Sequence, residues 1–330
     1  MHIGVIDPIC PQPYEFDTSA ETGLGGTEAT ALRVFGQLAS SFEITFFQNN
    51  RTEQSFNSGI HSRPLSELKD HAPLDRLITI GSWEFSLQAR QLFPNVPIVL
   101  WLHNYANRHN RSMGNALREA NIKLVCVSKT HMNATKRLLE TRSSCLPRLS
   151  YIYNAIDDAL LPNNTPRCKN RLLFASSPNK GLLQVLEKFD AISPMLPELQ
   201  LEVANPGYLQ FEPNELPPNV IFLGSLSQPK LIEKMRTSLC LFCPQTTFAE
   251  TFGLVIAEAN AVGTPVICQA SFGANDEIVS SVNQAIDTAN LETLVERIQQ
   301  LQKSKCMTSA RPEFRLENVA RHWDALLLDG

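Results

Sequence analysis

Two glutamates, Glu250 and Glu258, stand eight positions apart in the apolar stretch FAETFGLVIAEANAVGTPVI, residues 248–267. A carboxylate near a buried helix is costly unless it binds something. The preceding strand, LCLFC, ends at Pro244, and a helix is predicted to begin near Phe252 or Gly253. The free N–H groups and the dipole at this helix start favour an anion, and a glycine lets that anion approach the backbone closely.

The spacing of the two carboxylates fits a nucleotide sugar. Glu258 lies five residues beyond Gly253, which is roughly 7–8 Å along a helix axis. A diphosphate at the helix start would leave a hexose near Glu250 and a ribose near Glu258. On spacing alone a second interpretation stays open, in which the helix dipole favours Glu250 and Glu258 is a solvated helix residue.

The elements that must position these residues form two series along the chain. Short apolar runs such as HIGVI, EITFF, RLITI and PIVLWL alternate with amphipathic stretches, and the pattern restarts with RLLFAS after the polar segment LLPNNTPRCKN. Strands that alternate with helices indicate βαβ crossovers and parallel sheets. We therefore expect an α/β chain with two Rossmann-like domains, split near residues 155–168. Ligands would bind at the carboxyl ends of the strands, in a central cleft between the domains.

Composition narrows the class of protein. A chain of 330 residues favours two domains, and a net charge of −4 argues against a nucleic-acid partner. The eight scattered cysteines fit buried free thiols in a reducing cytosol, and the CxxC of Cys240 and Cys243 lacks a second pair at zinc spacing. No signal peptide or membrane-spanning run of about 20 apolar residues is visible. We expect a cytoplasmic protein, with peripheral contact to the inner membrane surface left open.

The stretch around the two glutamates resembles the E-x7-E signature of retaining glycosyltransferases of the GT-B fold, especially glycosyltransferase family 4 (glycosyl transferases group 1). The matching positions are Pro244, Glu250, Phe252, Gly253, Leu254, Glu258, Ala259, Ala261, Gly263, Pro265 and Val266. Other segments resemble the family in the same order: GLGGTEATALRVFGQLA, YIYNAIDD, FASSPNKGL, VIFLGSLSQ and SFGANDEIV. The resemblance implies an acceptor-binding domain over residues 1–155, a nucleotide-sugar-binding domain over 156–310, and a last helix, 311–330, that crosses back to the first domain.

The resemblance also implies roles for single residues. Glu250 would position the donor sugar, Glu258 the ribose and Lys180 the diphosphate. His103, with Asn104 as a companion, would orient the donor sugar or stabilise the transition state. The remaining expected donor contacts are Gly25, Gly26, Ser176, Ser177, Gly224, Leu226, Phe252, Gly253 and Leu254. From the residues alone the structural interpretations are favoured: Lys180 as a solvated surface lysine, His103 as a packing residue, and Gly25–Gly26 as a flexible entry to a helix.

One position departs from the family pattern, and one basic cluster is left without an assigned role. The family carries an arginine five positions before the lysine, where this chain has Ala175, so one cation for the leaving group is missing. The short basic cluster RHNR, residues 108–111, either meets an anionic acceptor or a lipid head group, or it is a solvated loop.

The resulting expectation is a retaining transfer of a hexose-type sugar from a nucleoside diphosphate sugar, UDP- or GDP-linked, to a glycan, lipid or small-molecule acceptor. The chain has no D-x-D motif, which agrees with a reaction that needs no metal. No cofactor is expected, because the nucleotide sugar is a substrate. The alternatives are a catalytically weak sugar-nucleotide or glycan-binding relative, and another GT-B enzyme such as an epimerase or phosphorylase. The sequence does not identify the acceptor.

Overall fold

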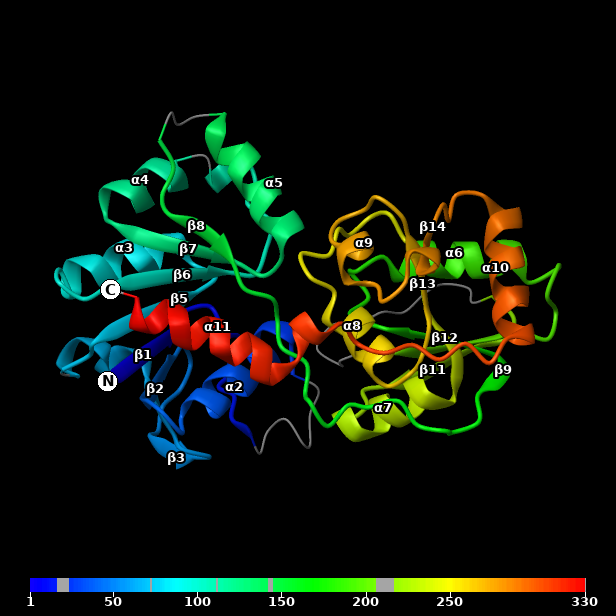
Figure 1. Cartoon of the computed structure of the whole chain (residues 1–330), viewed down its shortest axis with the longest axis horizontal. Helices are drawn as coiled ribbons and strands as arrows, with labels where there is room; N and C mark the ends of the chain where they lie inside the picture. The colour runs from blue at the N-terminus through cyan, green and yellow to red at the C-terminus, as the bar shows by residue number, and fades with distance from the viewer. Residues whose placement is uncertain (17–23, 72, 111, 142–144, 206–216, 330) are drawn as a thin grey trace. The chain divides into compact units, whose positions relative to one another are not determined.

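The computed structural model describes residues 1–16, 24–71, 73–110, 112–141, 145–205 and 217–329, and the chain divides into two compact α/β units (Figure 1). Unit 1 combines Met1–Phe16 and Gly26–Ala155 with the C-terminal segment Leu316–Gly330. Unit 2 contains Ile156–Arg315. The long-range contacts that define each unit come mostly from parallel strands, as the alternating pattern predicts.

The sheet of unit 1 has eight strands in the order β3-β4-β2-β1-β5-β6-β7-β8. All neighbouring strands are parallel except β3 and β4, which form an antiparallel hairpin at one edge. The strands are β1 (His2–Asp7), β2 (Glu43–Gln48), β3 (Ser55–Asn57), β4 (Ile60–Pro64), β5 (Arg76–Ile80), β6 (Ile98–Leu102), β7 (Ile122–Cys126) and β8 (Leu149–Tyr151). Every residue of β6 is buried, as expected for a strand covered on both faces.

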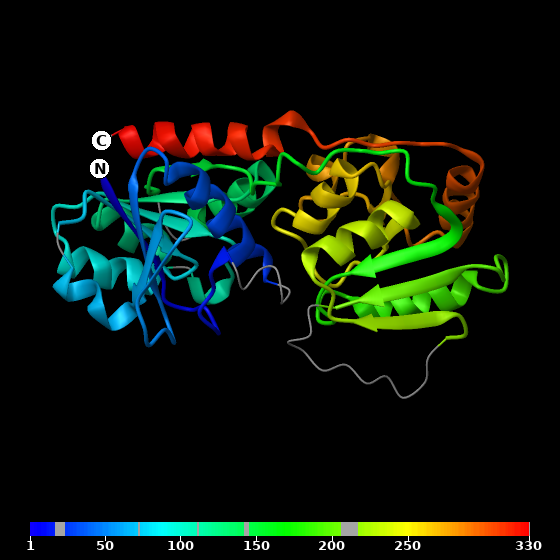
Figure 2. The same ribbon diagram turned by 90° about the horizontal axis from the view of Figure 1, so that it is seen from below.

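Helices cover both faces of this sheet. Successive side chains of a strand point to opposite faces, so each strand contacts both layers of helices. The helices are α2 (Gly26–Leu38), α3 (Trp83–Leu92), α4 (Met113–Glu119), α5 (Lys129–Glu140) and α11 (Leu316–Leu328), with the 3-10 helices η1 (Leu65–Asp70) and η2 (Arg108–Asn110). On β2, Phe47 joins the apolar cluster shared with η1, α3 and α4. Its neighbour Phe46 instead contacts Phe35 of α2. On that second face α11 packs along α2 (Figure 2).

The sheet of unit 2 has six parallel strands in the order β11-β10-β9-β12-β13-β14. They are β9 (Cys168–Ala175), β10 (Gln200–Ala204), β11 (Val220–Gly224), β12 (Ser238–Cys243), β13 (Val266–Gln269) and β14 (Ala285–Ile286). The helices are α6 (Leu182–Ile192), α7 (Gln228–Thr237), α8 (Leu254–Ala261), α9 (Asn275–Ile278) and α10 (Leu291–Lys303), with η3 (Val282–Gln284) and η4 (Pro312–Phe314). The core is built from β9, β10 and β12 against α6 and α10.

The strand order reverses between β9 and β12, at the centre of the second sheet. From β9 the chain continues outward to β10 and β11, whereas from β12 it continues the other way to β13 and β14. In open α/β sheets, ligands bind outside the carboxyl ends of the strands at such a reversal. The two segments at this point are 176–181, after β9, and 244–253, after β12.

The predicted α/β fold with parallel sheets is confirmed. The sequence pattern missed the β3–β4 hairpin and helices α3 and α4, because the hairpin is short and polar and the helices carry few buried residues. None of the helices in the described part of the chain combines the length and apolar character that crossing a bilayer requires.

Candidate functional site

The structure brings Lys180 and Glu250 together at the strand-order reversal of unit 2. The Lys180 Nζ lies 2.9 Å from Oε1 and 3.1 Å from Oε2 of Glu250, although the residues are 70 positions apart. The ammonium also lies 4.9 Å from the centroid of the Phe248 ring. The side chains are 32% and 15% exposed, respectively. Lys180 is therefore partly exposed and held in an ion pair with Glu250.

The segment that carries Lys180 is a tight turn between β9 and α6. The Lys180 N–H donates to the Ser177 carbonyl at 2.9 Å. Gly181 follows with φ +86° and begins α6 without a side-chain cap. A Cβ at this position would lie 2.7 Å from Cγ of Gln245, so only glycine fits the close approach of the two segments. Ser177 is buried and Ser176 is half-buried in the same turn.

Gln245 organises the segment that carries Glu250, and sequence reasoning missed it. Its Oε1 accepts the N–H groups of Thr247 at 2.9 Å and Phe248 at 2.8 Å. Its Nε2 donates to the Phe248 carbonyl at 2.8 Å. The side chain is buried, and it ties the turn before Glu250 to the turn after Lys180. A glutamine near a strand end has no distinctive sequence signal, because its partners are backbone groups.

The backbone of Glu250 is fixed from the other side by the segment SFGANDEIV. The Ala274 N–H donates to the Glu250 carbonyl at 2.9 Å. Gly273 has φ +55°, and a Cβ there would lie 2.7 Å from that same carbonyl oxygen. Gly273 therefore positions Glu250 by allowing close backbone contact, a role that the sequence pattern did not assign.

Helix α8 places the other members of the signature in the interior. Gly253, with φ +90°, begins the helix without a side-chain cap. Glu258 is only 4% exposed, so the interpretation of Glu258 as a solvated helix residue is wrong. Phe252, expected among the donor contacts, is 1% exposed, and its ring meets Phe314 edge-on with centroids 5.1 Å apart. Its side chain serves packing, and only its backbone is available to a ligand; Leu254 is half-buried.

The charge pattern at this edge suits an anion. Two helices, α6 and α8, begin here at left-handed glycines without side-chain caps, and one ammonium lies between the segments that lead to them. Helix starts and a lysine are the groups that bind phosphates. Ala175 is buried at the end of β9, so the position of the family's arginine carries no charge. Gly224 ends β11 and Leu226 follows it. Strand β10 separates β11 from β9, so both residues lie farther along the same edge.

His103 follows β6 in unit 1 and is buried beside Trp101, with ring centroids 4.5 Å apart. Burial, with a smaller contribution from the nearby His131, lowers the pKa of His103 to about 3. The ring is therefore neutral near pH 7. The packing that sequence reasoning kept as an alternative is present, and a polar role of this histidine would use the neutral imidazole.

His131, in the first turn of α5, supports the segment that follows β6, and sequence reasoning missed it. Its Nδ1 accepts the Val127 N–H at 3.3 Å, and its Nε2 lies 3.0 Å from the Asn104 carbonyl. A carbonyl only accepts, so the proton is on Nε2. Burial lowers the pKa of His131 to about 4. The neutral ring thus fixes the backbone next to His103.

The glycine pair opens α2: Gly26 is its first residue, and Gly25 directly precedes it. Glu28, in the first turn, is half-buried, and the resulting loss of hydration raises the pKa of its carboxyl; the nearby Asp7 adds to the effect. Asp7 ends β1, is fully buried and accepts the Tyr14 hydroxyl at 2.9 Å. This buried carboxyl was not singled out from the sequence.

Two further features concern charge and metals. In the cluster RHNR, residues 108–110 form η2, and Arg111 lies outside the described residues.

Across the described ranges, no three His, Cys, Asp or Glu side chains gather in a way that could hold a metal ion.

Comparison with known families places the site in context. Residues 169–317 match the family described as glycosyl transferases group 1. Over 108 residues the chain is 30% identical to a phosphatidyl-myo-inositol mannosyltransferase of Mycobacterium tuberculosis, and the match covers 31% of this chain. That segment spans only 28% of the length of the mycobacterial protein.

Solved structures resemble the chain over nearly its whole length. Sucrose-phosphate synthase from Thermosynechococcus elongatus has a TM-score of 0.69 at 16% identity, with 98% of each chain covered. Anabaena HepE, solved in complex with UDP, has a TM-score of 0.64 at 14% identity, with 99% of each chain covered. A UDP-forming α,α-trehalose-phosphate synthase from Burkholderia xenovorans, in complex with glucose-6-phosphate, has a TM-score of 0.69 at 8% identity, with 100% of this chain and 99% of that chain covered. At these identities the likeness establishes the fold.

Proposed function

Residues 169–317 match the glycosyl transferases group 1 family, and the chain has the GT-B fold. On this premise we propose that the chain is a retaining glycosyltransferase. It moves a hexose-type sugar from a nucleoside diphosphate sugar to an acceptor hydroxyl without a metal ion. The observation that carries the proposal is the Lys180–Glu250 pair, 2.9 Å apart, at the strand-order reversal of unit 2.

Each group at this edge has a role in the proposed reaction. The diphosphate of the donor binds Lys180 and the N–H groups at the starts of α6 and α8. Glu250 positions the donor sugar, and Glu258 receives the ribose from within α8. These interactions strengthen as negative charge develops on the departing diphosphate, which is how preorganised donors accelerate a reaction.

The proposed reaction needs no general base from the protein. The acceptor oxygen forms a bond to the anomeric carbon on the face from which the diphosphate leaves. The bond between that carbon and the phosphate oxygen breaks, and the acceptor proton passes to the departing diphosphate. The configuration at the anomeric carbon is therefore retained. His103 contributes as a neutral imidazole that orients the donor sugar.

The comparisons favour a uridine or guanosine diphosphate donor. One structural neighbour was solved with UDP and another is named as UDP-forming, while the curated relative is a mannosyltransferase. The proposal also includes the acceptor, which is a glycan, a lipid or a small molecule. All eight cysteines are free thiols, which supports a reducing, cytoplasmic location, with contact to a membrane surface if the acceptor is a lipid.

The test is nucleotide binding followed by product analysis. UDP, GDP, ADP and their hexose conjugates are titrated calorimetrically into wild type and Lys180→Ala, with EDTA and with magnesium. Lys230→Ala, an exposed lysine on α7, is the matched control. We expect one nucleotide to bind without metal, Lys180→Ala to weaken it by at least about tenfold, and the control to bind normally. Proton NMR of the glycoside formed then reports the anomeric configuration.

A second candidate function rests on Ala175. Because this buried position supplies no charge, the chain lacks one cation for the leaving group, and a nucleotide-sugar-binding protein with weak or no turnover is the alternative. Binding of a nucleotide sugar without transfer or hydrolysis over a broad acceptor panel favours this alternative. An inverted product or a strict metal requirement contradicts the proposed mechanism.

A further inference from the structure

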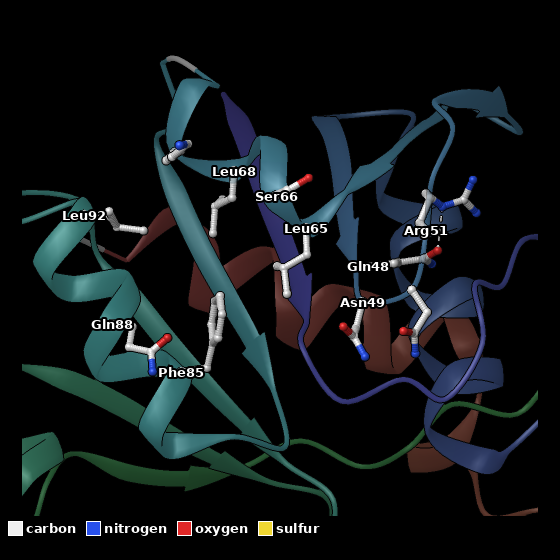
Figure 3. A pocket seen from close by; sticks show the side chains of 11 residues that line it. Gln48, Asn49, Arg51, Leu65, Ser66, Leu68, Phe85, Gln88 and Leu92 are labelled. Atoms are coloured by element: carbon white, nitrogen blue, oxygen red, sulfur yellow. Dashed lines mark hydrogen bonds between the residues drawn. The ribbon is translucent and has the colours of Figure 1, made fainter.

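Unit 1 contains a pocket of about 440 Å³ between η1, α3 and the segment that follows β2 (Figure 3). This volume lies within the range of small-molecule sites. The pocket adjoins the carboxyl ends of β2 and β4, because its lining begins at Gln48 and at Leu65, directly after β4. The carboxyl edge of a parallel sheet is where α/β folds bind ligands.

Helix α3 forms one wall of the pocket. Phe85, Gln88 and Leu92 follow one another at positions i, i+3 and i+7 on α3, so they share a face of the helix. Ser82 caps this helix by accepting the Phe85 N–H at 3.2 Å. The Phe85 ring and Leu65 of η1 line the interior in Figure 3, and Leu92, 51% exposed, lies at the rim.

The polar groups of the pocket are mainly neutral amides and a hydroxyl. Gln88 and Ser66 are exposed, and within the described chain neither side chain has a hydrogen-bond partner. Asn49 lies on the opposite side in Figure 3. An amide both donates and accepts, and a hydroxyl does the same. Such groups match sugar hydroxyls, which also do both.

Of the two cations that line the pocket, Arg51 is already paired with a carboxylate. Arg51 is 7% exposed, and its Nη2 lies 2.6 Å from Oε1 of Glu15. Its Nε donates to Gln48 at 2.8 Å and its Nη1 to Ser55 at 3.2 Å. The second lining cation, Lys69, is exposed at the end of η1. A phosphate in the pocket would therefore compete with Glu15 for Arg51.

We propose that this pocket binds an uncharged saccharide, with the apolar face of a sugar ring on Phe85 and its hydroxyls on Gln88, Ser66 and Asn49. An aromatic wall with a few neutral polar groups is the usual chemistry of such recognition. The inference rests on the proposed function and deepens it, because it assigns the acceptor to the class of neutral glycans rather than sugar phosphates or lipids.

The test uses the donor-free protein. Maltose, trehalose and glucose 6-phosphate are the probes, and saturation-transfer NMR titrations give their affinities. We expect a neutral sugar to bind, and Gln88→Ala to weaken it by about three- to tenfold, the effect of one lost hydrogen bond. Ser66→Trp, which fills the pocket from an exposed position, should abolish binding. Gln91→Ala, on the same helix and also exposed, is the matched control and should bind like wild type.

Three outcomes overturn the inference: no neutral sugar binds, glucose 6-phosphate binds more tightly through Lys69 than the neutral sugars do, or Gln91→Ala weakens binding as much as Gln88→Ala. Because no donor is present, failure here is separate from failure of the proposed function. If the protein binds a nucleotide and turns over the donor but binds no saccharide, only the saccharide pocket is rejected. If it binds a saccharide but no nucleotide, the proposed transferase function is rejected and the saccharide pocket is retained.

Discussion

The Lys180 ammonium engages both oxygens of the Glu250 carboxylate, at 2.9 and 3.1 Å. In the proposed reaction the same lysine binds a diphosphate, so the incoming ligand and Glu250 compete for one cation. The exchange frees the carboxylate to contact the sugar hydroxyls. The ion pair thus gives each of the two partly buried charges a partner of opposite sign.

The substitution Glu250→Gln should affect nucleoside diphosphate binding and sugar transfer in opposite directions. The amide keeps the size of the side chain but removes the charge that competes for Lys180. We expect the nucleoside diphosphate to bind about two- to fivefold more tightly, the value of a partly exposed ion pair. We expect transfer to fall by about 100-fold or more, because the sugar loses its positioning carboxylate. Calorimetry and initial rates measure the two effects.

Glu187→Gln provides the matched control, because Glu187 is an exposed glutamate on α6. It should change neither quantity. Weaker nucleotide binding in Glu250→Gln would show that the carboxylate contributes to diphosphate binding instead of competing with it, and the exchange of partners would then be rejected.

At the scale of elements, the N-terminal turn of α5 holds the segment that follows β6. The Nε2–H of His131 donates to the Asn104 carbonyl and its Nδ1 accepts the Val127 N–H. Protonation of the ring would add a hydrogen to Nδ1, and this N–H would then point at the Val127 N–H, which is also a donor. Protonation therefore breaks one of the two hydrogen bonds that fix the backbone beside His103, and burial adds to the cost.

The stability of unit 1 should consequently depend on pH. Burial lowers the pKa of His131 to about 4, below the ordinary value of 6.5, so the unfolded chain binds more protons between these values. The contribution is fully present above pH 6.5 and is lost as the pH falls toward 4. His131→Gln removes this titration, and the slope of unfolding free energy against pH should flatten by about 1.4 kcal/mol per pH unit within this window.

Urea unfolding of unit 1 at pH values across this window measures the slope, with His322→Gln as the control. His322 is exposed on α11, so its replacement should leave the slope unchanged. An equal slope in wild type and His131→Gln would mean that His131 is protonated in the folded protein or does not reach its partners.

At the scale of the whole molecule, the chain ends in the unit where it began. Helix α11 belongs to unit 1, and its Trp323 is fully buried, with ring centroids 4.8 Å from Trp101 and 5.8 Å from Phe35. The Arg76 Nε also donates to the Leu327 carbonyl at 3.1 Å. The core of the N-terminal unit is therefore complete only when the last helix has been added.

Trp323→Ala should accordingly destabilise unit 1, although it lies near the C-terminus. Removing a large buried aromatic side chain costs about 3–5 kcal/mol of unfolding free energy. Leu328→Ala on the same helix is the control, since Leu328 is 63% exposed, and it should cost no more than about 0.5 kcal/mol. Urea denaturation, followed separately for each unit, measures both values. Loss of stability in unit 2 alone would contradict the placement of α11.

The sequence by itself determined the kind of elements and the local signature. Apolar runs such as IVLWL, alternating with amphipathic stretches, predict a parallel α/β fold. The position of Gly253 after its loop predicts a helix that begins at the signature. Both patterns involve only residues that are close together in the sequence. The resemblance to the glycosyltransferase family also rests on local motifs.

Only the tertiary structure decided the partners. Strand order places the turn after β9 beside the turn after β12, and this pairs Lys180 with Glu250 across 70 positions. Gln245, Gly273 and His131 act through backbone groups that are distant in sequence or have no side-chain signature. The pocket of unit 1 collects residues from three separate segments. Contacts between segments depend on how the sheets assemble, and no local pattern records that order.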